Sequence, residues 1–326
     1  MRCLGLGLAA GLALACSGTA RAQDSPGPLA IYGNQQTFEI APVLVAAQDY
    51  PGGATVRMGG IPNLVGEPGA AGFSEVGAAD LATNAETQLL RLSVAHPDLR
   101  IILGVSEGLY RIVARRSAGI ATVADLKGKR IATIEPTSSG YFLQSMLARA
   151  GLSFADIIAR PIVPLSGMTE ALAKGEVDAV VIWEPESENA AQVLGEDLVV
   201  FGGEGVYREL FNLNTTAGKL ADPQVRPRIV RFVRAVLEAS AQVRRDPARA
   251  QALVAQAGGF SAAEIAESWP HHRFDAGFPP DLLDVLVAEE QWLAAQAKRP
   301  ARPRDELATL IDTSVYEEAL ALGDDR

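Results

Sequence analysis

Residues 123–152 read VADLKGKRIATIEPTSSGYFLQSMLARAGL and contain one complete strand–helix unit. A short helical turn ends at Gly128, and the β-branched and small residues of 131–134 predict a strand. The polar segment 137–140 then leads into a helix that we expect over 141–150. A strand followed directly by a helix is typical of an α/β protein.

The same alternation continues on both sides of this stretch. Residues 29–32 are predicted to form the first strand. The apolar run 177–183 is typical of a strand buried on both faces of a parallel sheet. Beyond residue 225 the pattern becomes mostly helical. The sequence therefore predicts an α/β fold along its whole length.

The N-terminus carries the features of an export signal. Arg2 precedes an apolar run over 4–15, and Ala20-Arg21-Ala22 places small residues where a signal peptidase reads them. The run is shorter than the roughly 20 residues that cross a bilayer. We expect residues 1–22 to be a signal peptide and the mature protein to be soluble in the periplasm.

Both cysteines, Cys3 and Cys16, lie in this leader. Residues 13–16 also resemble a lipoprotein cleavage box, so a form anchored to lipid at Cys16 stays a second interpretation. If cleavage follows Ala22, the mature chain has no cysteine, which excludes disulfides, thiolate metal sites and cysteine nucleophiles.

The size and charge of the chain restrict its partners. Roughly 300 residues remain after the leader, which is more than one typical core and suggests two lobes. Removing Arg2 and Arg21 would take the formal net charge from −10 to −12. An acidic surface argues against nucleic acid as a partner.

Signatures of catalysis and metal binding are sparse. The spacings HExxH, GxSxG, GxGxxG and the Walker motif do not occur in the sequence. His271 and His272 are adjacent, and adjacent side chains point in different directions on a regular helix or strand. We therefore expect no enzyme activity, no metal and no cofactor.

Three polar segments each follow a predicted strand and open a helix. The N-terminus of a helix has free N–H groups and a partial positive charge, so it suits an oxyanion. The same Ser, Thr and Asn side chains can instead serve only as helix caps. The three segments are Gln35-Gln36-Thr37, Thr83-Asn84-Ala85-Glu86-Thr87 and Thr137-Ser138-Ser139-Gly140.

Several stretches, in this order, resemble the nitrate/sulfonate/taurine type of periplasmic binding protein, a family that also includes binders of thiamine-pyrimidine precursors. They are Asp125–Ala132, Ser138–Leu143, Leu147–Leu152 with the outline LxxAGL, Ala171–Ala179, Trp183–Pro185 and Asp312–Ser314. The resemblance runs from about residue 29 to residue 320.

This resemblance implies a type II periplasmic-binding-protein fold, with two α/β lobes joined by two crossover strands. Lobe one would comprise residues 23–112 and 213–326, and lobe two residues 113–212. It also implies a monomer that captures a small polar or anionic organic solute between the lobes by hinge closure. The partner would be the permease of an ABC importer.

The resemblance further implies a set of ligand-binding residues from both lobes. They are Gln35, Gln36, Thr37, Asn84, Glu86, Thr87, Ser138, Ser139, Trp183, Glu184 and Asn214. Thr87 and Ser139 are expected to donate hydrogen bonds to the ligand. For Trp183, stacking on the ligand and packing in the core both stay open.

The sequence departs from the family in two places. Residues 66–72 form a Gly/Pro-containing loop where relatives usually carry a helix–strand unit, so the pocket wall is expected to differ. The three helix entrances contain no Arg or Lys, which leaves a neutral or weakly anionic ligand open.

Two other functions share this fold. An enzyme similar to the thiamine-pyrimidine synthases would need a cysteine-rich motif, which the mature chain lacks. An adaptor that senses a ligand for a membrane receptor would have the same pocket, so the sequence does not separate it from a transport protein.

Overall fold

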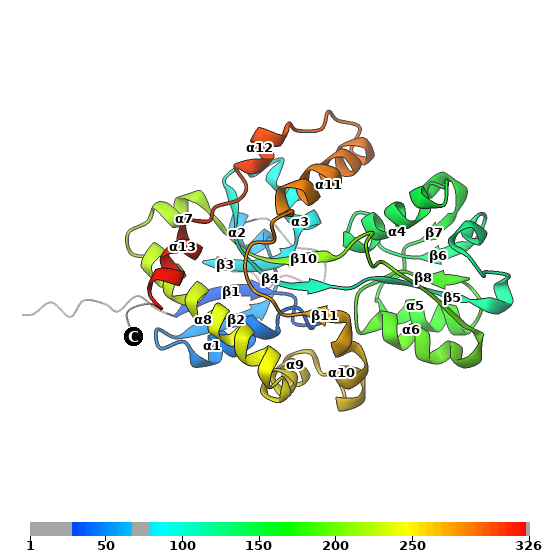
Figure 1. Cartoon of the computed structure of the whole chain (residues 1–326), viewed down its shortest axis with the longest axis horizontal. Coiled ribbons are helices and arrows are strands. Elements are labelled where there is room, and N and C mark those ends of the chain that lie inside the picture. The colour runs from blue at the N-terminus through cyan, green and yellow to red at the C-terminus, as the bar shows by residue number, and fades with distance from the viewer. Residues whose placement is uncertain (1–27, 67–77, 324–326) are drawn as a thin grey trace, which may run out of the picture.

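The computed structural model describes residues 28–66 and 78–323, which form two α/β lobes (Figure 1). The first lobe contains a six-stranded sheet in the order β11-β4-β10-β3-β1-β2. The second contains a five-stranded sheet in the order β7-β6-β8-β5-β9. The expected leader with Cys16, and loop residues 67–72, lie outside the described residues.

The strands of the first lobe are β1 (Leu29–Gly33), β2 (Ala54–Met58), β3 (Leu81–Ala85), β4 (Leu99–Gly108), β10 (Glu209–Thr216) and β11 (His272–Arg273). Those of the second lobe are β5 (Arg111–Arg115), β6 (Arg130–Ala132), β7 (Ile158–Arg160), β8 (Ala179–Val180) and β9 (Leu198–Gly202). The strand expected over 177–183 is thus confined to two residues of β8.

Helices cover the faces of both sheets (Figure 1). In the first lobe they are α1 (Ala41–Asp49), α2 (Pro62–Val65), α3 (Glu86–Ser93), α7 (Ala217–Ala221), α8 (Arg226–Arg245), α9 (Ala248–Gly258), α10 (Ala262–Ser268), α11 (Leu282–Gln296), α12 (Arg304–Ala308) and α13 (Ser314–Ala321). In the second lobe they are α4 (Ser138–Arg149), α5 (Ser166–Ala173) and α6 (Glu186–Leu194).

Strand direction determines where side chains can converge. β1 is parallel to both β2 and β3, whereas β10 runs antiparallel to its neighbours β3 and β4. In the second lobe, β6 is parallel to β7 and β8. The carboxyl ends of the parallel strands of each lobe therefore lie at one edge of its sheet.

The chain passes between the lobes twice. It leaves the first lobe between β4 and β5 and returns between β9 and β10 (Figure 1). Residues 111–112 already belong to β5, and residues 209–212 already belong to β10. Both crossings therefore precede the lobe boundaries expected from the sequence.

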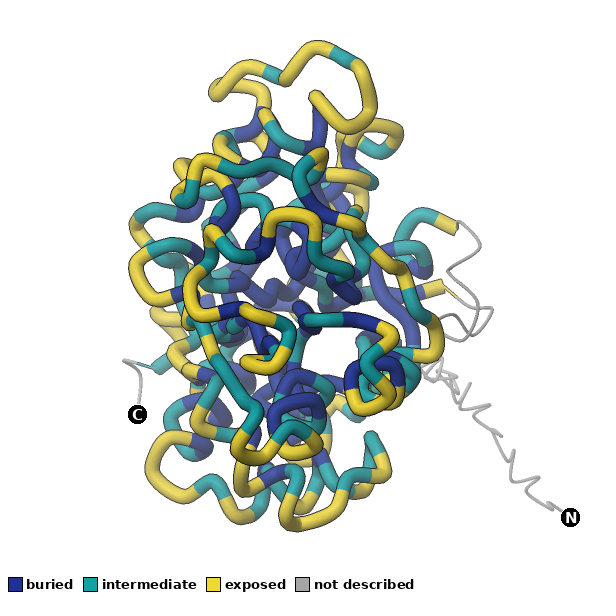
Figure 2. Tube along the Cα trace, turned by 90° about the vertical axis from the view of Figure 1, so that its right-hand side faces the viewer, coloured by how far each residue is buried: buried dark blue, intermediate teal, exposed yellow. Residues whose placement is uncertain are grey.

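Each lobe has its own apolar core. In the first lobe, one cluster packs α1 and α8 against one face of the sheet, and another packs α3 and α11 against the opposite face. The second lobe has two smaller clusters, one under α4 and one under α5 and α6. Figure 2 shows the buried segments in the interior of the molecule and the exposed ones at its periphery. No helix in the described ranges is long and apolar enough to span a membrane.

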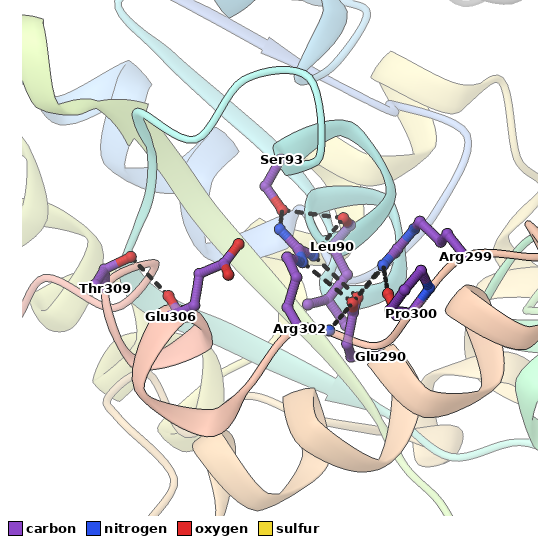
Figure 3. A network of polar contacts seen from close by, with 8 residues as sticks. All are labelled: Leu90, Ser93, Glu290, Arg299, Pro300, Arg302, Glu306 and Thr309. Atoms are coloured by element: carbon purple, nitrogen blue, oxygen red, sulfur yellow. Dashed lines mark hydrogen bonds and ion pairs between the residues drawn. The ribbon is translucent and has the colours of Figure 1, made fainter.

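A buried ion-pair network holds α3 in place (Figure 3). Glu290 on α11 is fully buried and accepts hydrogen bonds from Arg299 at 2.6 Å and from Arg302 at 3.0 Å. Arg302 also donates to the carbonyl of Leu90 and to the hydroxyl of Ser93, both at 3.0 Å. Burial alone would raise the pKa of Glu290, but the two arginines lower it to about 2. The segment before α12 therefore anchors the helix that follows β3.

We predict that Arg302→Ala lowers the free energy of unfolding by about 3 kcal/mol, because it leaves part of a buried carboxylate unpaired. Arg304→Ala is the matched control, since its partner Asp284 is exposed, and should cost less than about 1 kcal/mol. Urea unfolding followed by circular dichroism measures both. Equal losses in the two variants would show that the network does not anchor α3.

Candidate functional site

A cavity of about 210 Å³ lies between the two lobes. The segments after β1, β2 and β3 form its first-lobe side together with β10, and the start of α4 and the segment after β8 form its second-lobe side. The lining residues are Asn34, Thr37, Glu39, Gly59, Gly60, Pro62, Asn84, Ala85, Gln88, Arg91, Leu92, Thr137, Ser138, Trp183, Glu209 and Phe211. The cavity thus lies at the sheet edges where α/β proteins bind ligands.

Four residues of the predicted set line this cavity, namely Thr37, Asn84, Ser138 and Trp183. Asn84 Oδ1 accepts a hydrogen bond from the Ile61 N–H at 2.8 Å, which ties the end of β3 to the loop after β2. Trp183 lines the cavity and also packs against the apolar clusters of the second lobe. The two roles left open for its ring are thus compatible.

Three predicted residues point elsewhere. Gln35 donates from Nε2 to the carbonyl of Val56 at 3.1 Å, and Gln36 is exposed to solvent. Glu184 accepts a hydrogen bond from Arg111 at 2.9 Å and is almost fully buried. None of the three lines the cavity: the backbone of Val56 holds Gln35, Arg111 holds Glu184, and Gln36 faces solvent.

Glu86 and Asn214 are fully buried in the first lobe and also do not line the cavity. Glu86 accepts hydrogen bonds from the hydroxyl of Tyr207 at 2.6 Å and from the N–H of Leu210 at 2.9 Å. Asn214 lies in the middle of β10 and donates to the carbonyl of Ala82 at 3.2 Å. Both side chains hold the sheet and the second crossing together.

Thr87 and Ser139, the expected ligand donors, are fully buried and lie outside the cavity lining. The hydroxyl of Ser139 lies 2.9 Å from that of Thr137 and 3.3 Å from that of Thr133. Thr87 Oγ1 has no hydrogen-bond partner among the described residues. Successive residues of a helix point about 100° apart, so Ser139 can face the core while its neighbour Ser138 lines the cavity.

The helix entrance of the second lobe ends in Gly140 for a steric reason. A Cβ atom at this position would lie 1.9 Å from the carbonyl oxygen of Glu135. Only glycine lets the first turn of α4 pack this closely on the preceding loop. The helix begins at Ser138, earlier than expected, and Ser138 lines the cavity.

A buried hydrogen-bonded group connects the two lobes at the crossings. Tyr110, between β4 and β5, donates to Glu209 Oε2 at 2.5 Å. Its hydroxyl is 2.8 Å from that of Ser138, which lies 3.4 Å from the same Glu209 oxygen. Burial, followed by the charges of Glu39 and Glu86, raises the pKa of Glu209 well above its usual range. Burial and Glu209 likewise raise the pKa of Tyr110.

Glu39, after β1, is 2% exposed and lies against His272 of β11. Its Oε1 is 3.4 Å from Nε2 of His272, whose Nδ1 is 3.1 Å from the carbonyl of Ser268. Burial opposes charge on both groups, but their mutual attraction outweighs it, so the pKa of His272 is raised and that of Glu39 is lowered. Both shifts favour the charged forms of the two side chains.

The second oxygen of Glu39 has no such partner. Within the described ranges, Oε2 is buried and meets no hydrogen-bond donor. The nearby Thr37 hydroxyl contributes weakly to lowering the pKa of Glu39, but its hydrogen bond goes to the carbonyl of Asn34 at 3.3 Å. Glu39 lines the cavity, and its Oε2 is a buried acceptor without a donor among the described residues.

Gln88 and Arg91, further along α3, were missed by the sequence interpretation, which stopped at Thr87. Gln88 donates across the cleft to the carbonyl of Pro136 at 3.1 Å, and Arg91 donates to Gln88 Oε1 at 2.7 Å. Gln88 and Arg91 lie three residues apart on α3, which is the spacing of one helix face and a signal that would have found them. The cleft therefore does carry a cation, although the helix entrances contain none.

The described residues contain no group of three or more His, Cys, Asp or Glu side chains arranged to hold a metal ion. His272 is paired with Glu39, and His271 is separate from it. Burial and the charge of Arg111 lower the pKa of His271 to about 4.

We predict that Ser138→Ala weakens binding of any ligand held in this cavity by about fivefold, the effect of one neutral hydrogen bond. Its neighbour Ser139→Ala is the matched control. That variant should leave affinity unchanged and lower the free energy of unfolding by about 1 kcal/mol. Titration calorimetry and urea unfolding of both variants measure this. A loss of affinity in Ser139→Ala alone would restore the sequence prediction.

Comparison with known proteins identifies the family. The model of the family described as "NMT1/THI5 like" matches residues 70–250. The chain belongs to the NMT1/THI5-like family. A protein of Escherichia coli (strain K12) named for binding aliphatic sulfonates is 30% identical over 224 residues, which cover 66% of this chain and 67% of that protein.

Solved structures share the fold of this NMT1/THI5-like protein. The periplasmic aliphatic sulphonate binding protein from Escherichia coli superimposes with a TM-score of 0.70 and 20% identity, covering 88% of this chain and 92% of that one. A point mutant of the desulfurization enzyme DszB in complex with biphenyl-2-sulfinic acid has a TM-score of 0.62 and 15% identity, covering 91% of this chain and 99% of that one. The two-lobed fold therefore occurs in binding proteins and in an enzyme.

Proposed function

We propose that this protein is the solute-binding component of an ABC importer and captures a small organic acid of the sulfonate class between its lobes. The observation that carries the proposal is the cavity itself, which takes lining residues from both lobes. A ligand bound there contacts both lobes at once, so binding favours the closed arrangement. The sulfonate-binding relatives support the ligand class.

The cavity offers separate polar and apolar contacts. Asn84, Gln88 and Arg91 supply polar groups from the first lobe, and Thr137 and Ser138 supply hydroxyls from the second. These polar groups are enough for a small-molecule site, because such sites are commonly mostly apolar pockets with a few placed polar groups. Arg91 is the group that suits an acid, because a guanidinium donates to planar or tetrahedral oxyanions.

We further propose that the protein works as a monomer in the periplasm, delivers its ligand unchanged to a permease, and has no catalytic activity. The sequence features of an export leader support the location. Because a desulfurization enzyme has the same fold, catalytic turnover of the ligand is the alternative to test. Incubation with candidate sulfonates and sulfinates, followed by mass spectrometry of the solution, distinguishes the two, because stoichiometric product would contradict a binding-only role.

We predict that Arg91→Gln weakens binding of a sulfonate by about fivefold, since an exposed ion pair contributes about 1 kcal/mol. The loss should shrink as salt is added, because ions screen an exposed pair. Arg231→Gln, an exposed position on α8 that does not line the cavity, is the control. A thermal-shift screen of alkanesulfonates, then calorimetry of both variants, provides the measurement. If no sulfonate binds the wild-type protein, the proposed ligand class is wrong.

A further inference from the structure

Two buried acids outside the cavity lining meet between α3 and α11. Glu86 and Glu289 are both 0% exposed, and neither lines the cavity. Their side chains contact each other. Leucines of both helices, such as Leu89 and Leu286, belong to one apolar cluster that packs the helices together. Two acids in contact at such a place need compensation, because an unpaired buried charge is costly.

The two acids differ in their partners. Glu86 accepts one hydrogen bond at each oxygen, from the hydroxyl of Tyr207 at 2.6 Å and from the N–H of Leu210 at 2.9 Å. Among the described residues, neither oxygen of Glu289 meets a donor. A carboxylate has only acceptors, so the contact between the acids becomes a hydrogen bond only when one of them carries a proton. Because donors already hold Glu86 as an anion, the proton belongs on Glu289.

The charges around the pair favour the same assignment. Burial, followed by the charges of Glu86 and Glu209, raises the pKa of Glu289 well above its usual range. Burial also raises the pKa of Glu86, against the hydrogen bonds that favour its charged form. The tyrosines that face the pair stay neutral below pH 9. Burial raises the pKa of Tyr141 to about 12, and burial with the charge of Glu86 raises that of Tyr207 well above its usual range.

The arginines of the surrounding elements are committed to other partners. They are Arg91 on α3 with Gln88, Arg208 in the second crossing with Glu107 and Asp281, Arg299 and Arg302 before α12 with Glu290, and Arg304 on α12 with Asp284. Within the described ranges, a proton is thus what compensates the two acids.

The pair lies on the helix by which the first lobe contacts the second. Trp292, three residues after Glu289 on α11, packs on Tyr141 of α4 with ring centroids 5.4 Å apart. Figure 1 shows the two helices beside each other. Tyr141 also packs on Tyr207, again at 5.4 Å, and Tyr207 is the donor to Glu86. The position of α11 therefore affects the contact between the lobes.

We propose that one proton shared by Glu86 and Glu289 fastens α11 to the second crossing, and that loss of this proton to the solvent releases α11 and lets the lobes separate. Deprotonation breaks the hydrogen bond from Glu289 to Glu86 and leaves two anions in contact. Glu289 is the one that leaves, because Glu86 keeps its donors. Trp292 moves with the helix, so its contact with Tyr141 is lost. A closed cleft retains a ligand, so retention becomes dependent on pH whatever the ligand class is.

The direction of the pH effect follows from the raised pKa of Glu289. A carboxyl of this kind stabilises the fold fully below its unfolded pKa, and the contribution is lost as pH rises through its folded pKa. Glu290 and Glu39, whose pKa values are lowered, act in the opposite direction. The contribution of Glu289 is therefore measured as a difference from a variant that cannot titrate there.

The first test uses the isosteric variant Glu289→Gln, which keeps a donor toward Glu86 without a titrating proton. Urea unfolding of the ligand-free mature protein should give a folding constant that falls, relative to that of the variant, by up to about tenfold per pH unit above about pH 5. Asp284→Asn removes an exposed acid from the same helix and is the matched control, with no such divergence expected. Parallel pH profiles for the wild-type protein and Glu289→Gln would overturn the shared proton.

The second test follows α11 and the lobes in the ligand-free protein. With Trp183→Phe and Trp269→Phe, Trp292 is the remaining tryptophan, and its quenching by acrylamide should increase between pH 5 and 9. The radius of gyration of the wild-type protein, from small-angle X-ray scattering, should increase over the same interval. Glu289→Gln should abolish both increases, and Asp284→Asn neither.

No change in the wild-type protein up to pH 9, or equal increases in Glu289→Gln, would contradict the fastening. Increased quenching at a constant radius would overturn its link to the lobes. If Glu289→Gln does not fold, scattering and quenching with the native glutamate decide. Neither experiment needs a ligand, so the outcome does not depend on the proposed ligand class.

Discussion

The hydrogen bond between Tyr110 and Glu209 lies where the chain passes between its lobes, and the cleft depends on it. Tyr110 is on the first passage, Glu209 begins β10 after the second, and Ser138 brings the start of α4 to the same two groups. Sequentially distant segments thus meet at one buried point. Because a buried polar group without a partner is costly, each of the three restricts the positions of the others.

The same point sets the electrostatics of the cavity. Burial disfavours a charge on Glu209, and the acids around it add to that effect, so the pKa of this carboxyl is raised. Arg91 supplies the opposite charge from α3, the helix that the Glu290 network holds in place. The overall acidity of the chain says little about either group, because a ligand responds to the charges nearest to it.

Local sequence patterns located the site only coarsely. Strand–helix alternation predicted that the segments after β1, β3 and β6 open helices at one edge, and the cavity lies there. The patterns did not distinguish Ser138 from Ser139, because the direction of a side chain at a helix start depends on how the turn packs. Gly140 permits the close packing of that turn, because a Cβ there would lie 1.9 Å from the carbonyl oxygen of Glu135. Glu39 and Glu209 carried no signal, since a lone glutamate near a strand is ordinary in sequence.

The sequence by itself determined the α/β class, the two-lobed architecture and the family, because hydrophobic periodicity, turn residues and short motifs are local properties of the chain. Tertiary structure alone decided which side chains face the cleft, as Thr87 and Ser139 turned into the core while Arg91 and Glu209 line the cavity. Those choices depend on contacts between residues more than a hundred positions apart, such as Tyr207 with Glu86. Burial, charge balance and pKa arise only when such contacts form, and no local pattern records them.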